Sequence, residues 1–410
     1  MSAPTLRLEV PGSKSLTQRA LVAAALAAGE SRLVAPLDCD DSRALRAALG
    51  ALGAGIDEMP DGWRVRGGGL GAVTAPVFSG DGGTTLRFLA ALALVLAPAP
   101  GTAAVELVLD ASPQLRRRPH AALLEALAAL GLEVQSRGGG SLFPLELVRR
   151  GPVAPRVRVA AGQSSQFASA LLLVAPRCPE GLVVELEGEP VSRPYLDLTL
   201  EVMRAFGAKV DAREQSFRVH PGPYHARTFA IEGDWSSAAF LLAAAELAGV
   251  PVAVPNVRPD SAQGDRRMAD FLAALAGARQ EPLSFDLGPC PDLIAPLAVA
   301  CAFARVPCRI ANAAHARHKE SDRIAVLAGE LGRAGVRIAA RPDGLALEPG
   351  GALVPARLEP HGDHRMAMAF GLLSLREPGI EVADRACVQK SYPGFWDDLE
   401  RVRAHATRRA

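Results

Sequence analysis

Short polar segments and long apolar ones alternate along the whole chain. Six apolar, Ala/Leu-rich segments each follow directly on a cluster of glycine, serine or charged residues, which we call a polar start. The polar starts lie 57 to 82 residues apart, at Gly12, Gly80, Gly162, Gly233, Cys290 and Gly362. This interval is too long for a common solenoid repeat and fits a βαβαββ module.

Each polar start is predicted to open a helix that is apolar on nearly all sides and is therefore buried. A second, amphipathic helix is predicted between successive polar starts. It usually ends in an apolar residue and glycine before a strand, as at Leu130-Gly131 and Phe206-Gly207. Glycine past a helix end accepts the left-handed conformation that closes the last turn.

Buried helices with polar starts predict that helix N-termini gather at shared sites. Unpaired N–H groups and aligned dipoles at such ends favour bound anions without a high net charge. One polar start alone is typical of an ordinary helix cap, whereas six in register favour a shared cleft.

Length and composition narrow the class of protein. A chain of 410 residues exceeds a single hydrophobic core and predicts two domains. Apolar residues make up 49% of the chain and charged residues 22%, as in globular proteins. The net charge of +1 argues against a nucleic-acid or acidic-membrane partner, because such partners usually require an excess of basic residues.

The remaining composition favours a cytoplasmic protein. The six cysteines lack metal-ligand spacing and are predicted to be reduced. The first residues do not resemble a secretory signal, and the longest apolar run is too short to span a bilayer.

Lysine is scarce, and its four positions are therefore informative. Of 45 basic residues the lysines are Lys14, Lys209, Lys319 and Lys390. Lysine provides a compact charge with an adjustable pKa, so one that persists in an arginine-rich chain is a candidate for chemistry. Lys209 lies in an amphipathic stretch and is interpreted as a surface residue.

The first charged cluster suits a phosphate. Lys14 begins a predicted helix, and Ser15 and Arg19 share one face of it. The spacing of a P-loop is absent, so nucleotide hydrolysis has no support.

The second cluster combines cations with one carboxylate. Lys319 and Arg323 are four residues apart, and Glu320 lies between them at a predicted helix start. A solvated charge run and a positioned acid–base group beside an anionic ligand are equally compatible with this pattern.

A third cluster surrounds Arg365 in His361-Gly362-Asp363-His364-Arg365. Zinc is the competing interpretation, but a helical His-x-x-x-His pair is missing and Arg365 would repel a cation. Capture of a carboxylate by the guanidinium fits better.

Five motifs together resemble the 5-enolpyruvylshikimate-3-phosphate synthase family, in its order and with similar spacing, from about Leu8 to Val402. They are Pro11-Gly12-Ser13-Lys14-Ser15 with Arg19, Gly83-Thr84-Thr85-Leu86-Arg87, Ser164-Ser165-Gln166, Lys319-Glu320-Ser321-Asp322-Arg323 and Asp363-His364-Arg365-Met366-Ala367-Met368.

The resemblance implies an α/β fold, a two-domain inverse α/β barrel. Each domain would hold three βαβαββ units, with buried helices whose N-termini face the interdomain cleft. The first domain would span 12–228 on the shikimate 3-phosphate side, and the second 1–11 with 229–410.

The implied reaction transfers the enolpyruvyl group of phosphoenolpyruvate to the 5-hydroxyl of shikimate 3-phosphate and releases phosphate. No metal or organic cofactor is implied, and we expect a cytoplasmic monomer with neither a nucleic-acid nor a membrane partner.

The resemblance also implies roles for individual residues. Asp292 would take the proton of the attacking hydroxyl, Glu320 would move the proton of the enolpyruvyl methyl carbon, and Lys14 and Lys390 would neutralise the leaving phosphate. Residues expected to bind shikimate 3-phosphate are Lys14, Ser15, Arg19, Ser164, Ser165, Gln166, Ser192, Tyr195, Asp292, His315 and Lys319. Residues expected to bind phosphoenolpyruvate are Lys14, Gly83, Arg118, Gln166, Arg323, Arg365 and Lys390, with Arg323 and Arg365 on its carboxylate and Arg118 on its phosphate.

Two positions depart from the family pattern, because Asp81 and His315 stand where its best-known members carry asparagine. A carboxylate near the phosphate site weakens binding of the anionic substrate, and we expect Arg87 or Arg118 to pair with Asp81 and offset this.

Two alternative functions remain open: a homologue in specialised metabolism that acts on another shikimate-derived substrate, and a ligand-binding homologue without catalysis. The sister enzyme that acts on UDP-N-acetylglucosamine is disfavoured, because Ser15 follows Lys14 and the loop cysteine of that enzyme is missing.

Overall fold

The computed structural model describes residues 5–138 and 141–408. The chain divides into two compact units. The N-terminal unit is Gly12–Ile231, and the C-terminal unit combines Met1–Pro11 with Glu232–Ala410. This division differs by three residues from the predicted boundary between residues 228 and 229, and it keeps whole the strand β13 (Thr228–Ala230), which pairs with Arg32–Val34 of β2 (Gly29–Val34).

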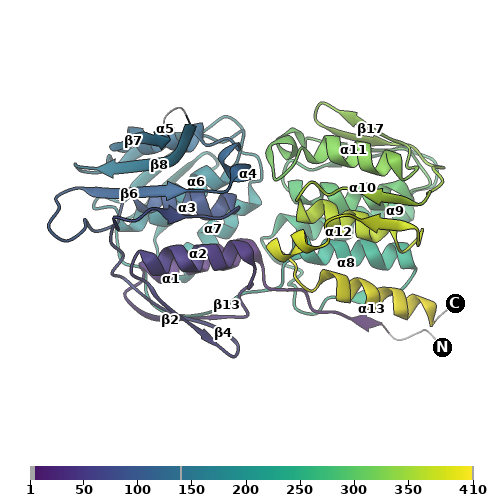
Figure 1. Ribbon diagram of the computed structural model, residues 1–410, viewed down its shortest axis with the longest axis horizontal. Coiled ribbons are helices and arrows are strands. Elements are labelled where there is room, and N and C mark those ends of the chain that lie inside the picture. The colour runs from purple at the N-terminus through teal and green to yellow at the C-terminus, as the bar shows by residue number, and fades with distance from the viewer. Residues whose placement is uncertain (1–4, 139–140, 409–410) are drawn as a thin grey trace. The chain divides into compact units, whose positions relative to one another are not determined.

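Three four-stranded sheets surround the helices of the N-terminal unit (Figure 1). Their strand orders are β13-β2-β4-β3, β5-β6-β8-β7 and β9-β10-β12-β11, each with one parallel pair followed by two antiparallel pairs. The strands are β2 (Gly29–Val34), β3 (Gly55–Met59), β4 (Gly62–Gly67), β5 (Val77–Phe78), β6 (Val105–Asp110), β7 (Leu132–Gly138), β8 (Ser141–Arg149), β9 (Arg156–Ala160), β10 (Leu182–Glu187), β11 (Val210–Ala212), β12 (Ser216–Val219) and β13.

The helices of this unit fall into two kinds. Those that follow polar starts are α1 (Lys14–Leu26), α3 (Gly83–Leu92) and α6 (Ser165–Val174). Those between polar starts, with η for 3-10 turns, are α2 (Asp40–Ala51), α4 (Pro113–Arg116), α5 (Ala121–Ala129), η1 (Ala175–Arg177) and α7 (Pro194–Ala205). Every residue of α1 from Leu16 onward is buried, whereas α2 alternates between buried and exposed positions. The predicted contrast between buried and amphipathic helices is therefore confirmed.

The C-terminal unit contains one complete four-stranded sheet and two parallel strand pairs in its described residues. The complete sheet has the order β15-β16-β18-β17, and the pairs are β1-β14 and β19-β20. The strands are β1 (Leu6–Arg7), β14 (Val252–Ala253), β15 (Leu283–Asp286), β16 (Cys308–Ala311), β17 (Ile338–Arg341), β18 (Gly344–Leu347), β19 (Ala356–Leu358) and β20 (Ile380–Val382).

Three full βαβαββ units were expected here, and the shortest interval between polar starts explains one difference. After β14 the chain runs through η2 (Gly264–Arg267) and α9 (Met268–Gly277) into β15, so the interval from Gly233 to Cys290 does not accommodate the antiparallel hairpin. The same two-strand pattern recurs where β20 is followed by η5 (Ala386–Lys390) and α13 (Phe395–Thr407).

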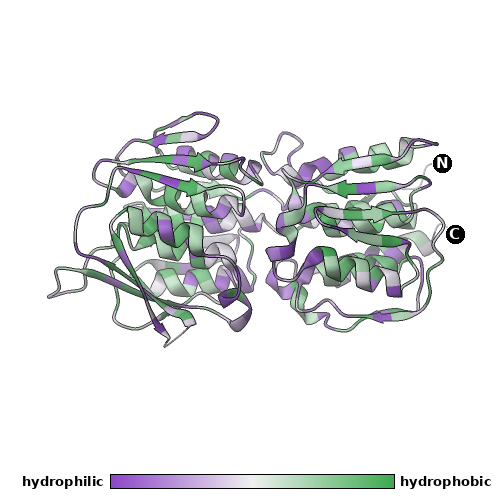
Figure 2. Cartoon of the chain, turned by 90° about the horizontal axis from the view of Figure 1, so that it is seen from above, coloured by the Kyte–Doolittle hydropathy of each residue, from purple (hydrophilic) through white to green (hydrophobic). Residues whose placement is uncertain are grey.

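Three buried helices also form the centre of the C-terminal unit. They are α8 (Trp235–Ala248), α10 (Ile294–Ala302) and α12 (His364–Leu373), and every residue of α12 and of α10 up to Cys301 is buried. The remaining helical segments are η2 (Gly264–Arg267), α9 (Met268–Gly277), η3 (Pro291–Leu293), η4 (Ala314–His318), α11 (Arg323–Arg333), η5 (Ala386–Lys390) and α13 (Phe395–Thr407). Figure 2 shows green, apolar residues dominating the helices within each unit.

Candidate active site

The C-terminal unit brings several helix starts to one buried cluster. Asp292 lies in η3 before α10, Arg323 is the first residue of α11, and Arg365 lies in the first turn of α12. α10 and α12 follow polar starts, and α11 begins at the charged segment around Lys319 and Glu320, so all three N-termini carry charged side chains.

Arg323 is the centre of this cluster and is 1% exposed. Its Nη1 donates to Asp292 Oδ1 at 2.8 Å, and its Nη2 donates to Glu320 Oε2 at 2.9 Å. Asp363 accepts from Nε at 2.8 Å and from Nη2 at 3.3 Å. Three carboxylates therefore surround one guanidinium, and they balance the cost of burying its charge.

Asp363 joins this ion-pair network to α12. It is fully buried, and its Oδ1 accepts the backbone N–H of Arg365 at 3.0 Å as the N-cap of the helix. Its Oδ2 also accepts from Ser321 Oγ at 3.1 Å. The sequence motif contained Asp363, but its cation-holding role was missed because it depends on contact with Arg323, forty residues away.

Arg365 and Lys390 complete the cluster. Arg365 Nη2 lies 3.2 Å from Asp292 Oδ2, and Lys390 Nζ lies 3.9 Å from Glu320 Oε1. Lys390 is buried at the end of η5, although its sequence surroundings gave no charged cluster. The structure thus brings together five predicted residues, Asp292, Glu320, Arg323, Arg365 and Lys390, from four separate segments of the sequence.

The charges in this cluster control the pKa of Asp292. Burial disfavours its charged form, but Arg365, Lys319 and Arg323 outweigh that effect and hold the pKa of Asp292 well below its usual range. Burial and the charge of Lys319 lower the pKa of His315 to about 4. At neutral pH Asp292 is therefore a carboxylate and His315 is uncharged.

The N-terminal unit places a lysine at the start of α1. Lys14 Nζ lies 3.1 Å from Asp41 Oδ2, and the Asp41 backbone carbonyl accepts from Thr85 Oγ1 at 3.2 Å. Thr85 in turn accepts from Gln18 Nε2 at 3.2 Å. These contacts link the first turns of α1, α2 and α3, and sequence reasoning did not single out Asp41.

Arg19 is more deeply buried than a surface ligand contact requires. Its Nε donates to Thr199 Oγ1 at 2.8 Å, and its Nη2 donates to Ser169 Oγ at 3.3 Å and to the Tyr195 carbonyl at 3.2 Å. Its Nη1 donates to the Ser15 carbonyl at 2.9 Å. Burial lowers the pKa of Arg19 to about 10, which leaves it charged at neutral pH. Arg19 therefore ties α1, α6 and α7 together.

A second pair of arginines lies at the start of α3. A Cβ atom on Gly83 would stand 2.8 Å from Arg87 Nη1 and 3.0 Å from Arg118 Nη1, so the glycine leaves room for both side chains. Arg87 donates to Gln166 Oε1 and, at 3.1 Å, to the Pro119 carbonyl. The predicted Gln166, Gly83 and Arg118 thus meet around Arg87.

Asp81 accepts a hydrogen bond from Ser112 Oγ, the N-cap residue of α4. The expected pairing of Asp81 with Arg87 or Arg118 stays a prediction.

The serines predicted to bind shikimate 3-phosphate lie at the starts of α6 and α7. Ser164 Oγ caps α6 by accepting the Gln166 N–H at 3.2 Å, and Ser165 is buried beside it. Ser192 precedes α7 with φ at 59°, a left-handed conformation that is uncommon for residues other than glycine. Tyr195 follows in the first turn of α7, with its N–H bonded to the Ser192 carbonyl at 3.0 Å.

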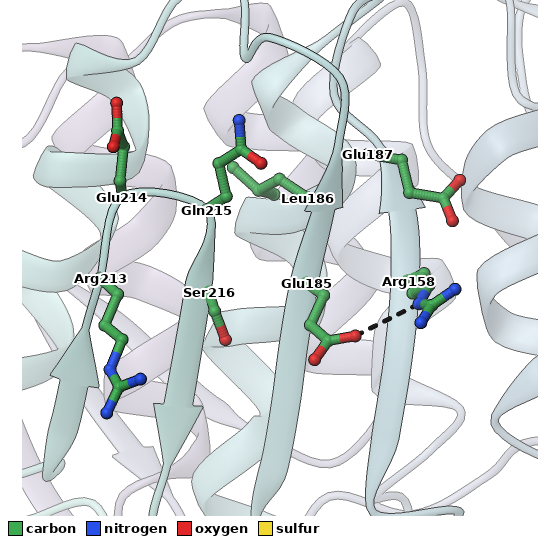
Figure 3. Close-up of a pocket in the computed structure, with 8 residues that line it drawn as sticks. All are labelled: Arg158, Glu185, Leu186, Glu187, Arg213, Glu214, Gln215 and Ser216. Carbon is green, nitrogen blue, oxygen red and sulfur yellow. Dashed lines mark hydrogen bonds and ion pairs between the residues drawn. The ribbon is translucent and has the colours of Figure 1, made fainter.

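A surface hollow elsewhere in the N-terminal unit has a different character. It has a volume of about 520 Å³ and lies across β9, β10 and β12, as Figure 3 shows. Arg158 pairs with Glu185 there at 3.3 Å, and the other charged lining residues are Glu187, Arg213 and Glu214. Because three carboxylates outnumber two guanidiniums and the helix starts contribute no residue, the hollow does not suit an anion, and we do not assign the substrates to it.

The structure describes residues 5–138 and 141–408, and two kinds of feature are absent from them. Within these ranges there is no group of three histidine, cysteine or acidic side chains arranged to hold a metal ion. The same residues include no helix that is long and apolar enough to cross a membrane.

The fold resembles solved enolpyruvyl transferases. An EPSP synthase from Acinetobacter baumannii superposes with a TM-score of 0.77 at 22% identity, covering 97% of this chain and 95% of that one. The enolpyruvyl transferase NikO from Streptomyces tendae superposes with a TM-score of 0.70 at 15% identity, covering 98% and 95%. These likenesses establish the two-domain α/β fold of this class.

Sequence comparison defines the family within that class. The model of EPSP synthase (3-phosphoshikimate 1-carboxyvinyltransferase) matches residues 5–399. The 3-phosphoshikimate 1-carboxyvinyltransferase of Methanothermobacter thermautotrophicus is 38% identical, covering 96% of this chain and 95% of that protein. That of Dehalococcoides mccartyi is 37% identical, covering 99% and 98%. The chain belongs to the EPSP synthase family.

Proposed function

We propose that the protein is a 3-phosphoshikimate 1-carboxyvinyltransferase of the shikimate pathway, which leads to chorismate and the aromatic amino acids. It transfers the enolpyruvyl group of phosphoenolpyruvate to the 5-hydroxyl of shikimate 3-phosphate and releases phosphate. Family membership supports this assignment. The observation that carries it is the buried cluster in which Arg323 and Arg365 share the carboxylate of Asp292.

The two guanidiniums of this cluster suit the carboxylate of phosphoenolpyruvate. Arginine presents parallel N–H groups that match the two oxygens of a carboxylate. In the structure Arg365 Nη2 contacts Asp292 at 3.2 Å, and this side chain is only 8% exposed. A substrate carboxylate would find a cation that is already held in place, so less ordering is needed on binding.

Asp292 and Glu320 are suited to the two proton transfers. We assign to Asp292 the proton of the attacking 5-hydroxyl, and to Glu320 the proton that is added to and later removed from the methyl carbon. The surrounding cations keep Asp292 ionised and ready to accept. Glu320 is held between Arg323 and Lys390, at 2.9 and 3.9 Å. Such fixed geometry is what general acid–base catalysis requires.

We assign shikimate 3-phosphate chiefly to the N-terminal unit and the phosphate of phosphoenolpyruvate to Lys14, Arg118 and Lys390. Ser164 uses its oxygen to cap α6, which leaves its hydroxyl hydrogen for a ligand oxygen. In the described residues the buried hydroxyl of Ser13 lacks a hydrogen-bond partner, which also suits a ligand at the start of α1. Residues expected to complete this side are Ser15, Arg19, Ser165, Gln166, Ser192, Tyr195, His315 and Lys319.

The deciding experiment measures phosphate release on mixing the protein with both substrates. We expect phosphate and the enolpyruvyl product to form together, and neither when one substrate is omitted. Asp292→Asn is expected to lower kcat by about 10²–10⁴-fold. Asp286→Asn, which removes an exposed carboxylate at the end of β15, is the matched control and should retain activity. Absence of both products at saturating substrate would refute the proposal.

The second candidate is a homologue that uses another shikimate-derived acceptor. The positions Asp81 and His315 favour it, because both depart from the family pattern. Replacing shikimate 3-phosphate by related acceptors in the same assay would identify it by a higher kcat/KM. We further propose a cytoplasmic monomer, which gel filtration and cell fractionation would test.

A further inference from the structure

One buried carboxyl group in the C-terminal unit has no role in the chemistry assigned above. Asp265 lies in η2 and is 2% exposed. Its Oδ2 accepts a hydrogen bond from Ser236 Oγ in the first turn of α8, and its Oδ1 has no hydrogen-bond partner among the described residues. An acid so deeply buried with half of its carboxyl unsatisfied is costly to ionise.

Asp265 faces the same helix starts as the active-site cluster. The charged groups around it are Asp234, the N-cap of α8, Asp292 of η3 and Arg365 of α12. The thiol of Cys290 also lies beside it. On the side of α9, Arg267 stacks on Phe271 and also interacts with the Cys290 thiol, whereas Asp270 is exposed. Among the charged groups around Asp265, Arg365 is the cation that favours its ionised form.

We propose that Asp265 is a positioning residue that acts as a neutral acid, leaving Arg365 to the substrate carboxylate, and that its ionisation weakens phosphoenolpyruvate binding. This inference rests on the proposed function. When Asp265 loses its proton to solvent, a second acidic group beside Asp292 becomes negative. That charge attracts Arg365 and repels the incoming carboxylate of phosphoenolpyruvate.

Asp265 changes its protonation state near neutral pH. Burial raises the pKa of Asp265, the negative charge of Asp292 raises it further, and Arg365 and the Ser236 hydrogen bond oppose the rise, which brings it to about 7. Both forms are therefore populated around neutral pH. The geometry distinguishes Asp265 from Asp292, which sits against two guanidiniums and stays ionised.

Asp265→Asn tests this, because asparagine can still accept the Ser236 hydrogen bond but cannot ionise. KM for phosphoenolpyruvate is measured for wild-type and variant from about pH 6 to about pH 8.5, a range that spans the titration. We expect the wild-type-to-variant KM ratio to be near 1 at the lower pH and to rise to about 5–10 at the higher pH. The ratio for shikimate 3-phosphate should stay constant. Titration of the substrate phosphate cancels in such ratios.

The matched control is Asp270→Asn, which removes an exposed carboxylate five residues along the same segment. Its KM ratio should not change with pH. A role for Asp265 in folding alone would lower the amount of active protein at every pH and leave the ratio flat, and a flat ratio overturns the proposal.

If Asp265→Asn does not fold, the wild-type protein gives a second test. Carbon-13 NMR of aspartate carboxyl groups would follow the buried carboxyl with and without saturating phosphoenolpyruvate. Since linkage is reciprocal, bound substrate should raise the apparent pKa of Asp265. A titration that substrate does not move, or no buried carboxyl titrating near neutral pH, contradicts the proposal. Failure of the wild-type protein to release phosphate would instead contradict the proposed function.

Discussion

Replacing Asp363 by asparagine tests whether the buried ion-pair network stabilises the C-terminal unit. The carboxylate accepts four hydrogen bonds, from Arg323 Nε and Nη2, from Ser321 Oγ and from the N–H of Arg365. Asparagine retains the helix cap, since its oxygen also accepts an N–H. It loses the two-point ion pair with Arg323 and turns an amide N–H₂ toward a guanidinium.

The expected loss of unfolding free energy in Asp363→Asn follows from the burial of this ion pair. Removing one partner of a buried ion pair costs about 3–5 kcal/mol. Arg323 keeps Asp292 and Glu320, so we expect the lower end, about 3 kcal/mol. Asp322→Asn is the matched control, because Asp322 also caps a helix and pairs with an arginine, Arg317, but with side chains 29% and 39% exposed. An exposed pair contributes about 0–1 kcal/mol.

Urea unfolding followed by tryptophan fluorescence measures both variants. Trp235 and Trp396 lie in the C-terminal unit and Trp63 in the N-terminal unit, so a Trp63→Phe background reports on the C-terminal unit alone. With an m value of about 2 kcal/mol/M, the midpoint of Asp363→Asn should fall by about 1–2 M urea. If the unfolding free energies of Asp363→Asn and Asp322→Asn differ by less than about 1 kcal/mol at equal m, the network does not stabilise the unit as argued.

Three further variants test the substrate sites. Gly83→Ala places a Cβ atom 2.8 Å from Arg87 Nη1, so KM for phosphoenolpyruvate should rise about tenfold with stability unchanged, while Gly162→Ala, with open space around it, should behave as wild-type. Asp81→Asn should change the dissociation constant of phosphoenolpyruvate by less than about threefold if a neighbouring cation already offsets this carboxylate, and a large gain in affinity would exclude that offset. Folding lowers the pKa of His315 from its ordinary value to about 4. As pH falls from about 6.5 to about 4, the unfolded chain therefore takes up a proton at His315 that the folded protein does not, and the unfolding free energy decreases. His315→Asn should lose less unfolding free energy over this window, and an equal loss would contradict the assigned burial.

The repeated helix starts could be predicted from the sequence because burial and polarity are local signals. The helices expected after Gly12, Gly80, Gly162, Gly233 and Gly362 begin within three residues of those positions. Only after Cys290 does a 3-10 turn come first, because Pro291 and Asp292 precede α10.

Partners distant in the sequence could not be predicted. Asp41, Asp265 and Asp363 each lie in a short polar segment that resembles a solvated loop. Their significance comes from a lysine, a serine and an arginine that the fold brings to them. Arg19 shows the converse, since its spacing from Ser15 predicted a ligand contact but not the four bonds that it makes inside the unit.

The pairing of β1 with β14 has a consequence for protein synthesis. Val10, just after β1, donates its N–H to Asn256, 246 residues later, and all of the N-terminal unit is made in between. At about 5–20 residues per second, β1 waits roughly 10–50 seconds after its synthesis for its partner strand. The N-terminal unit can fold during that interval, while the C-terminal unit is completed by a segment translated before it.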